Sequence, residues 1–196
     1  MGTLAHAVAV LALAATSALA QAPGASKLPP EPAPTPLPAE FSDEARRAYA
    51  AGLKESRDLL AEKRYDAAIA KLETLSKERP REPQARFLKA VAESESGKPD
   101  AAMATLNALV ADFPELPEVH NNLAVLYAAR GNLDLAKTEL ELAIATSPEY
   151  APAIENLGDV YARLAARQYE RAVALEKGKG AAPAKLKLVR DALAVR

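Results

Sequence analysis

The sequence offers few residues whose type and spacing could support catalysis. Of its two histidines, His6 lies in a predicted export signal, which leaves His120 as the only histidine of the mature chain. A lone histidine in the first turn of a helix is more often a packing or surface residue than a ligand. The sequence has no glycine-rich phosphate loop, zinc-ligand spacing or Gly-x-Ser-x-Gly elbow. We therefore expect no enzymatic activity, no metal site and no cofactor.

The charged side chains do not indicate a catalytic site or a nucleic-acid interface. Carboxylates such as Glu139 and Glu141 alternate with lysines along predicted helices, a pattern typical of solvated faces. The net charge is -1, so no excess of positive charge is present to bind a phosphate backbone, and nucleic acid is excluded as the expected partner. The chain has no cysteine, which excludes disulfides, thiolate metal sites and thiol catalysis.

The first 20 residues have the features of a signal peptide. Residues 4–20 are nearly all apolar, and Ala18-Leu19-Ala20 before Gln21 has the small-x-small form of a cleavage site. This pattern predicts cleavage after Ala20, a periplasmic or secreted protein, and no stable membrane insertion after cleavage. The alternatives are a buried alanine-rich helix and an uncleaved membrane anchor.

A proline-rich linker is predicted at residues 21–41, where seven of the fifteen prolines of the chain lie. Repeated proline removes amide donors and disfavours the helical conformation of each preceding residue. The composition favours a disordered or semi-rigid tether, with a ligand for a proline-recognising module as the alternative. The remaining residues, 42–196, are rich in alanine and poor in aromatic residues, which favours close-packed helices over a sheet.

A 34-residue pattern organises these remaining residues. Residues 117–150 contain two amphipathic helical patterns that flank a turn at Gly131-Asn132. The positions that define the pattern are His120, Leu123, Ala124, Tyr127, Ala136, Leu140 and Pro148. A shift of 34 residues returns Pro114, Gly97, Ala102 and Leu106, and a second shift returns Pro80, Ala68 and Leu72. This spacing resembles the tetratricopeptide repeat, except that His120 stands where Trp is usual.

The resemblance implies an all-α, right-handed solenoid of three to four helical hairpins. The predicted repeats are residues 43–82, 83–116, 117–150 and 151–176, followed by a capping helix at 183–195. The second repeat departs from the family at Lys89 and Glu93, where Leu and Tyr are usual. The fourth repeat lacks the turn, because nothing between Ala153 and Lys177 breaks a helix. We expect one continuous helix of about 24 residues there instead of a hairpin.

The resemblance also implies a scaffold or adaptor that binds a peptide or partner protein on the face lined by the first helix of each repeat. The candidate groove residues, which we expect on the exposed side of those helices, are Phe87, Leu88, Val91, Asn121, Asn122, Val125, Asn156, Asp159 and Arg163. Asn122 and Asn156 recur at one repeat length, and an asparagine side chain both donates and accepts hydrogen bonds to a peptide backbone. Alternatively, these asparagines satisfy a neighbouring helix, and Phe87, Leu88 and Val91 pack beneath the first repeat.

Other functions remain open at this point. The signal peptide places the predicted scaffold in the cell envelope, and two alternatives are self-association into a homo-oligomer and an accessory subunit of an envelope enzyme or secretion complex. Repeats of this family that clamp C-terminal carboxylates use lysines and arginine together with asparagines. Here only Asn122 and Asn156 match that set, and Glu155 and Asp159 would repel a carboxylate, so the sequence argues against that role.

Overall fold

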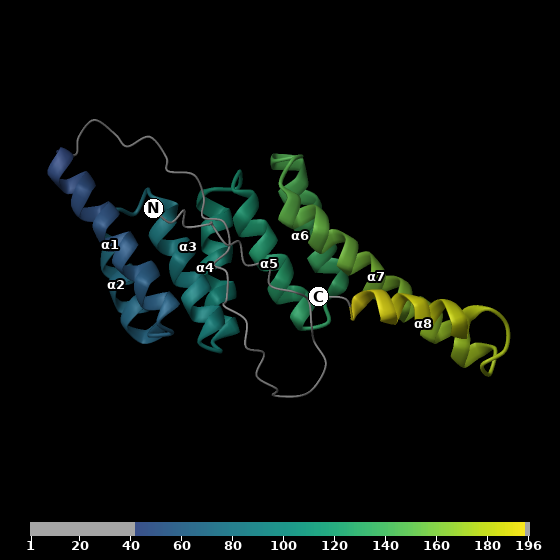
Figure 1. Ribbon diagram of the computed structural model, residues 1–196. Helices are drawn as coiled ribbons and strands as arrows, with labels where there is room; N and C mark the ends of the chain where they lie inside the picture. Colours follow the sequence, from purple (N-terminus) through teal and green to yellow (C-terminus); the bar gives the residue numbers. More distant parts are fainter. Residues whose placement is uncertain (1–41, 195–196) are drawn as a thin grey trace, which may run out of the picture. The chain divides into compact units, whose positions relative to one another are not determined.

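The computed structural model describes residues 42–194, and every regular element within that range is an α-helix. The all-α prediction is therefore confirmed, and Figure 1 shows the order of the helices. The predicted signal peptide, the proline-rich linker and the last two residues lie outside the described residues. The helices are α1 (Asp43–Ala61), α2 (Tyr65–Glu78), α3 (Pro83–Glu95), α4 (Pro99–Asp112), α5 (Pro117–Ala129), α6 (Leu133–Thr146), α7 (Ala151–Leu175) and α8 (Ala182–Leu193).

Contacts among the described residues fall into two compact units that meet in the sequence between Val119 and His120. The N-terminal unit, residues 42–119, contains α1 to α4 and the first turn of α5. The C-terminal unit, residues 120–194, contains the rest of α5 and α6 to α8. None of the described helices combines the length and the apolar character that a membrane crossing requires.

Short turns join the helices of the first three repeats into hairpins. Gly97 and Gly131 have φ angles of 76° and 78°, in the left-handed region that glycine adopts without a steric penalty. The first repeat places Lys63 there instead, with a φ of 58°. The predicted turn positions of the second and third repeats are therefore left-handed turns in the structure.

The first helix begins at a capped N-terminus and approaches α2 closely. The Ser42 side chain accepts a hydrogen bond of 3.2 Å from the Ala45 amide, as its position before two acidic residues predicts. Near the middle of α1, Gly52 stands where a large apolar residue is usual. A Cβ atom at Gly52 would lie 2.8 Å from Cδ2 of Leu75, so the missing side chain is what makes room for that leucine of α2.

The core of the N-terminal unit lies between α1, α2 and α3. Its buried members are Tyr49, Leu53, Leu60, Ala68, Leu72, Leu75, Ala85, Leu88 and Ala92. Ala68 and Leu72 are the second-helix positions of the repeat pattern, and both are fully buried. The small residue of the pattern therefore allows α2 to pack closely against the first helix, as alanine at this position predicts.

The C-terminal unit contains one hairpin and one long helix. The core between α5, α6 and α7 includes Ala124, Ala128, Leu133, Ala136, Leu140, Ala143, Ala153 and Val160. Helix α7 runs for 25 residues without interruption, which confirms the prediction of a continuous helix in the fourth repeat. After turns at Gly178 and Gly180, α8 packs against α7 and buries Ala182 and Leu186 (Figure 1).

Candidate partner-binding site

One group of the predicted site residues lies where α5 and α7 meet. The Asn156 side chain of α7 donates a hydrogen bond of 2.8 Å through Nδ2 to Oδ1 of Asn121 in α5. Both side chains are buried, and Oδ1 of Asn156 is a buried acceptor without a hydrogen-bond partner. A buried acceptor without a protein partner can be satisfied by a ligand group or by an ordered water molecule.

Two further predicted residues follow Asn156 on the same helix. Asp159 and Arg163 are half-buried and lie about one and two turns beyond it. Burial lowers the pKa of the Arg163 guanidinium, and the neighbouring Asp159 carboxylate partly offsets this effect. Nη1 of Arg163 is a buried donor without a hydrogen-bond partner. Asn156, Asp159 and Arg163, here called the α7 polar row, thus combine an unpaired acceptor with an unpaired donor.

The expectation of exposure is wrong for seven of the nine predicted site residues. Those that the structure buries are Phe87, Leu88, Val91, Asn121, Asn122, Val125 and Asn156. Leu88 belongs to the core that Tyr49 and Leu53 form, so for this residue the interpretation as packing beneath the first repeat is confirmed. A helical period predicts the face of the helix on which a residue lies but not what covers that face, so the burial was not predicted.

The asparagine prediction is correct in part. A neighbouring-helix role holds for Asn156, but its partner is Asn121 and not Asn122, the residue one repeat length earlier. The hydrogen bond joins positions 35 residues apart and not 34. A repeat period identifies equivalent positions, whereas contacts between adjacent first helices are set by their packing geometry.

His120 has a partner inside the third repeat. Its Nδ1 lies 2.7 Å from Oε2 of Glu139, which links α5 to α6, and the His120 ring is buried. This arrangement agrees with the interpretation of His120 as a packing residue. In the described part of the chain, no group of three or more histidine, aspartate and glutamate side chains is placed to hold a metal ion.

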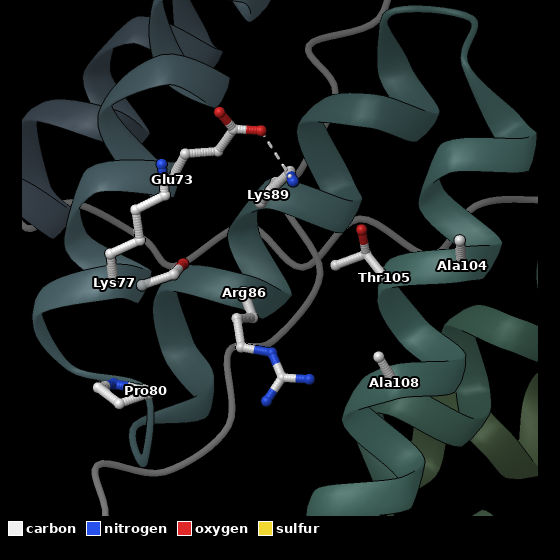
Figure 2. Close-up of a pocket in the computed structure, with 9 residues that line it drawn as sticks. Glu73, Lys77, Pro80, Arg86, Lys89, Ala104, Thr105 and Ala108 are labelled. Carbon is white, nitrogen blue, oxygen red and sulfur yellow. Dashed lines mark ion pairs between the residues drawn. The ribbon is translucent and has the colours of Figure 1, made fainter.

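An open surface cavity in the N-terminal unit, bordered by charged side chains, was not predicted. It has a volume of about 670 Å³ and lies between α2, α3 and α4, as Figure 2 shows. Its lining includes Glu73, Ser76, Lys77, Pro80, Arg86, Lys89, Ala104, Thr105 and Ala108. The signal for it in the sequence is the pair Lys89 and Glu93, which occupy positions where the repeat usually has Leu and Tyr.

Three of the charged residues around this cavity, Glu73, Lys89 and Arg86, form ion pairs within the chain. Nζ of Lys89 lies 2.9 Å from Oε1 of Glu73, the pair drawn in Figure 2, and 3.5 Å from Oε1 of Glu93. Thr105 donates a hydrogen bond of 2.8 Å to the other oxygen of Glu93, and Arg86 pairs with Asp112 at 2.6 Å. This polar network joins α2, α3 and α4, which makes a structural role the simplest account of the cavity.

The pKa shifts of Lys89 and Glu73 agree with their pairing. Burial by itself would lower the pKa of Lys89, but the hydrogen bond to Glu73 and the charges of Glu93 and Glu73 raise it. The hydrogen bond to Lys89, followed by the charge of the same lysine, lowers the pKa of Glu73. Each partner therefore favours the charged form of the other.

Several solved structures share this fold. A tetratricopeptide repeat protein of Thermus thermophilus has 26% sequence identity and a TM-score of 0.56, covering 74% of this chain and 83% of its own. The first such domain of Spaghetti (RPAP3), solved with an HSP90 peptide, has 19% identity and a TM-score of 0.55, covering 61% of this chain and 94% of its own. The Yersinia enterocolitica secretion chaperone SycD, solved with a peptide of the translocator YopD, has 14% identity and a TM-score of 0.54, covering 64% and 98%.

Sequence comparison gives the family. No curated protein sequence matches the chain. The family model described as tetratricopeptide repeat matches residues 59–126 and 95–158, which together span 100 of the 196 residues. The matched region contains the helix pairs from the end of α1 to the start of α7, where the 34-residue pattern places its alanines, leucines and glycines. The chain therefore belongs to the tetratricopeptide repeat family.

Proposed function

We propose that this protein is an interaction module that binds an extended peptide segment of a partner protein through the α7 polar row and Asn121. The observation that carries the proposal is the unpaired acceptor on Asn156 together with the unpaired donor on Arg163. A peptide backbone presents one N–H donor and one C=O acceptor per residue. The N–H can donate to Oδ1 of Asn156, and the C=O can accept from Nη1 of Arg163.

The spacing of the two groups suits an extended ligand. Seven residues separate Asn156 from Arg163 along α7, a rise of about 10 Å at 1.5 Å per residue. An extended peptide covers that distance with about three residues at 3.3 Å each. Arg163 and Asp159 are half-buried and form the accessible end of the row, whereas Asn156 is its buried end, so the Asn156 side chain must turn outward when the ligand binds.

The negative charges in and beside the α7 polar row limit which peptides can bind. Asp159 lies between the two unpaired groups, and Glu155 precedes Asn156 as an exposed carboxylate. These two carboxylates repel an acidic peptide terminus, so the proposed ligand is an internal peptide segment with neutral or basic side chains. The similar structures of RPAP3 and SycD were solved with bound peptides, which supports peptide binding as the class of function at the level of the fold.

The location in the cell envelope is a further part of the proposal and rests on the sequence of residues 1–20. An export signal followed by a proline-rich tether and a helical repeat domain suits an adaptor in envelope assembly. Mass measurement of the protein recovered from the periplasm or medium tests this part. A chain that begins at Gln21 is the expected result, and an intact N-terminus would contradict cleavage.

Peptide display tests the binding site directly. Random twelve-residue peptides displayed on phage are panned against the full chain, and the affinity of the enriched peptides is then measured by calorimetry. Replacement of Asn156 or Arg163 by alanine removes one charge-assisted or neutral hydrogen bond, so we expect Kd to rise by about 5- to 30-fold for each variant.

A matched control is the replacement Arg171→Ala, which removes an exposed arginine of the same helix outside the α7 polar row. Its Kd should stay within about twofold of the wild-type value, because a surface arginine away from the ligand contributes little. Enriched peptides that bind the Asn156→Ala and Arg163→Ala variants as tightly as the wild type would exclude the α7 polar row as the site.

A further inference from the structure

Helix α7 carries an uncovered apolar stripe on the side away from its polar row. Ile154 and Tyr161 are each 49% exposed, and Leu175 is 83% exposed. The stripe consists of Ile154, Gly158, Tyr161, Ala165, Ala172 and Leu175, with Gln168 as its polar member. Successive members are three or four residues apart in alternation, the spacing that keeps side chains on one seam of a helix.

The third repeat shows what normally covers these positions. One repeat length before Ile154, Gly158 and Tyr161 lie His120, Ala124 and Tyr127 of α5. His120 and Ala124 are buried and Tyr127 is half-buried. Ala124 and Tyr127 pack against the core that α6 supplies with Ala136, Leu140 and Ala143, each fully buried. In a complete repeat, the first-helix face is therefore covered by a small-and-apolar face of the second helix.

The fourth repeat retains a second-helix face as well. The residues equivalent to Gly131–Leu135 are missing after Leu164, and beyond that point Ala165, Tyr169 and Ala172 match Ala136, Leu140 and Ala143. Because the turn is missing, both faces lie end to end on the same side of one continuous helix. A straight helix cannot fold onto itself, so the two faces cannot meet within one chain.

Helix α8 does not cover the exposed residues of the stripe, Ile154, Tyr161 and Leu175. It contacts the second half of α7 beside the stripe, where Arg190 pairs with Glu170 at 2.7 Å and the Lys185 ammonium lies 6.0 Å from the centre of the Tyr169 ring. Tyr169 and Ala172 remain half-buried, and Leu175 stays exposed. The residues equivalent to the second-helix face are thus only partly covered, and Ile154 and Tyr161 of the first-helix face are each 49% exposed.

We propose that a second copy of this chain packs antiparallel along α7, so that the first-helix face of each copy covers the second-helix face of the other. The two faces that pack together within the third repeat then pack together between two copies. Loss of a hinge turn favours such an exchange of equivalent contacts, and the two-fold axis makes both contacts identical. Gly158, Ala165 and Ala172 recur every seven residues, and their lack of bulk lets a second helix approach closely. A Cβ at Gly158 meets nothing within 4 Å, so this position is open in the single chain.

This dimer does not depend on the proposed peptide site. Asn156 and Arg163 lie roughly 160° to 200° around the helix from Ile154, at 100° per residue. Both faces of α7 can therefore be occupied in the same molecule. Loss of peptide binding leaves the dimer intact, and loss of the dimer leaves the α7 polar row intact.

Sedimentation equilibrium of the full chain over a range of concentrations tests the proposal. We expect a dimer, and we expect Ile154→Lys and Tyr161→Lys each to raise its dissociation constant by about tenfold or more, because a lysine is then desolvated in the seam. The matched control is Leu142→Lys, which changes a leucine of α6 that is 44% exposed and lies outside the stripe. Its dissociation constant should stay within about twofold of the wild type.

Cross-linking tests the antiparallel register without relying on destabilising variants. The chain has no cysteine, so single thiols can be introduced at Tyr161 and Ala165, which face each other between the two copies in this register. Oxidation of an equimolar mixture of the Tyr161→Cys and Ala165→Cys chains should link the two variants to each other. A mixture of Tyr161→Cys and Ala174→Cys should not be linked, because the exposed Ala174 faces away from the stripe. A wild-type chain that is monomeric at all concentrations would overturn the proposal, as would a dimer in which Ile154→Lys and Ala165→Cys behave like their controls.

Discussion

The third and fourth repeats begin with the same motif and end with different structures. His120, Ala124 and Tyr127 belong to a hairpin whose second helix buries them or half-buries them. Their counterparts Ile154 and Tyr161 belong to a helix that continues straight on, and both are half exposed. A difference of five residues, which includes the left-handed Gly131, separates the two outcomes.

This difference shows that the motif of the first helix does not by itself determine the hairpin. The apolar periodicity is nearly the same in both repeats, but the fourth lacks a residue that takes a positive φ angle between its two faces. Without such a residue, the helix continues unbroken from Leu164 to Gln168, because each residue added to a formed helix gains one hydrogen bond.

The largest expected effect concerns the second-helix face of the third repeat. Leu140 is fully buried between α5 and α6, so Leu140→Ala removes apolar contacts and leaves a cavity. We expect the free energy of unfolding to fall by about 2–5 kcal/mol. Urea denaturation followed by circular dichroism measures this value, and Leu142→Ala, at an exposed position of the same helix, should change it by less than about 0.5 kcal/mol. Equal losses for both variants would contradict the described packing of α6.

A second prediction compares the equivalent small residues of the two repeats. Ala124→Leu forces bulk into a fully buried site and should lower the free energy of unfolding by about 1–3 kcal/mol. Gly158→Leu meets open space and replaces a poor helix former, so it should raise the free energy by about 0.5–1 kcal/mol. Both are measured by urea denaturation at a dilution where the chain is monomeric. A similar loss at the two positions would mean that the fourth repeat is covered like the third.

The second repeat provides a third case, because its first helix contacts its neighbours through the charged residues Lys89 and Glu93. Lys89→Ala leaves the buried Glu93 carboxylate with Thr105 but without its cation, and we expect a loss of about 1–3 kcal/mol in the free energy of unfolding. The double variant Lys89→Leu with Glu93→Tyr restores the residue types usual in the family. It should unfold within about 1 kcal/mol of the wild type, or be more stable. A double variant weaker than Lys89→Ala would show that the polar network itself determines how α2, α3 and α4 pack.

The smallest expected effect is the pH dependence of the pair between Glu73 and Lys89. Lys89 holds the pKa of Glu73 below its usual value of 4.5, so the pair contributes stability above pH 4.5. That contribution is lost as the pH falls through the lower pKa of the folded state. Urea denaturation between pH 6 and pH 3 should show a shallower loss of stability for Glu73→Gln than for the wild type, and the effect is small because the Glu73 side chain is half exposed. Identical slopes would argue against the pair.

The sequence predicted much of the fold because its signals are local. Alanine, leucine and glycine at one fixed period identify hairpins, and the lack of any helix breaker between Ala153 and Lys177 identifies α7. The predicted site was less accurate, because burial depends on neighbours that are distant in the sequence. Asn156 bonds Asn121, and Lys89 bonds Glu73 of the preceding repeat, contacts that no period within one helix reveals.

Hydrogen exchange along the wild-type chain tests most directly that one motif folds back and the other continues straight. Mass spectrometry of the exchanged protein compares a peptide that contains Asp134 and Leu135 with one that contains Leu164 and Ala165. Asp134 and Leu135 lie in the first turn of α6, where amides have no intrahelical partner, so we expect faster exchange there than around Leu164 in the interior of α7. Fast exchange at both places would contradict a continuous α7.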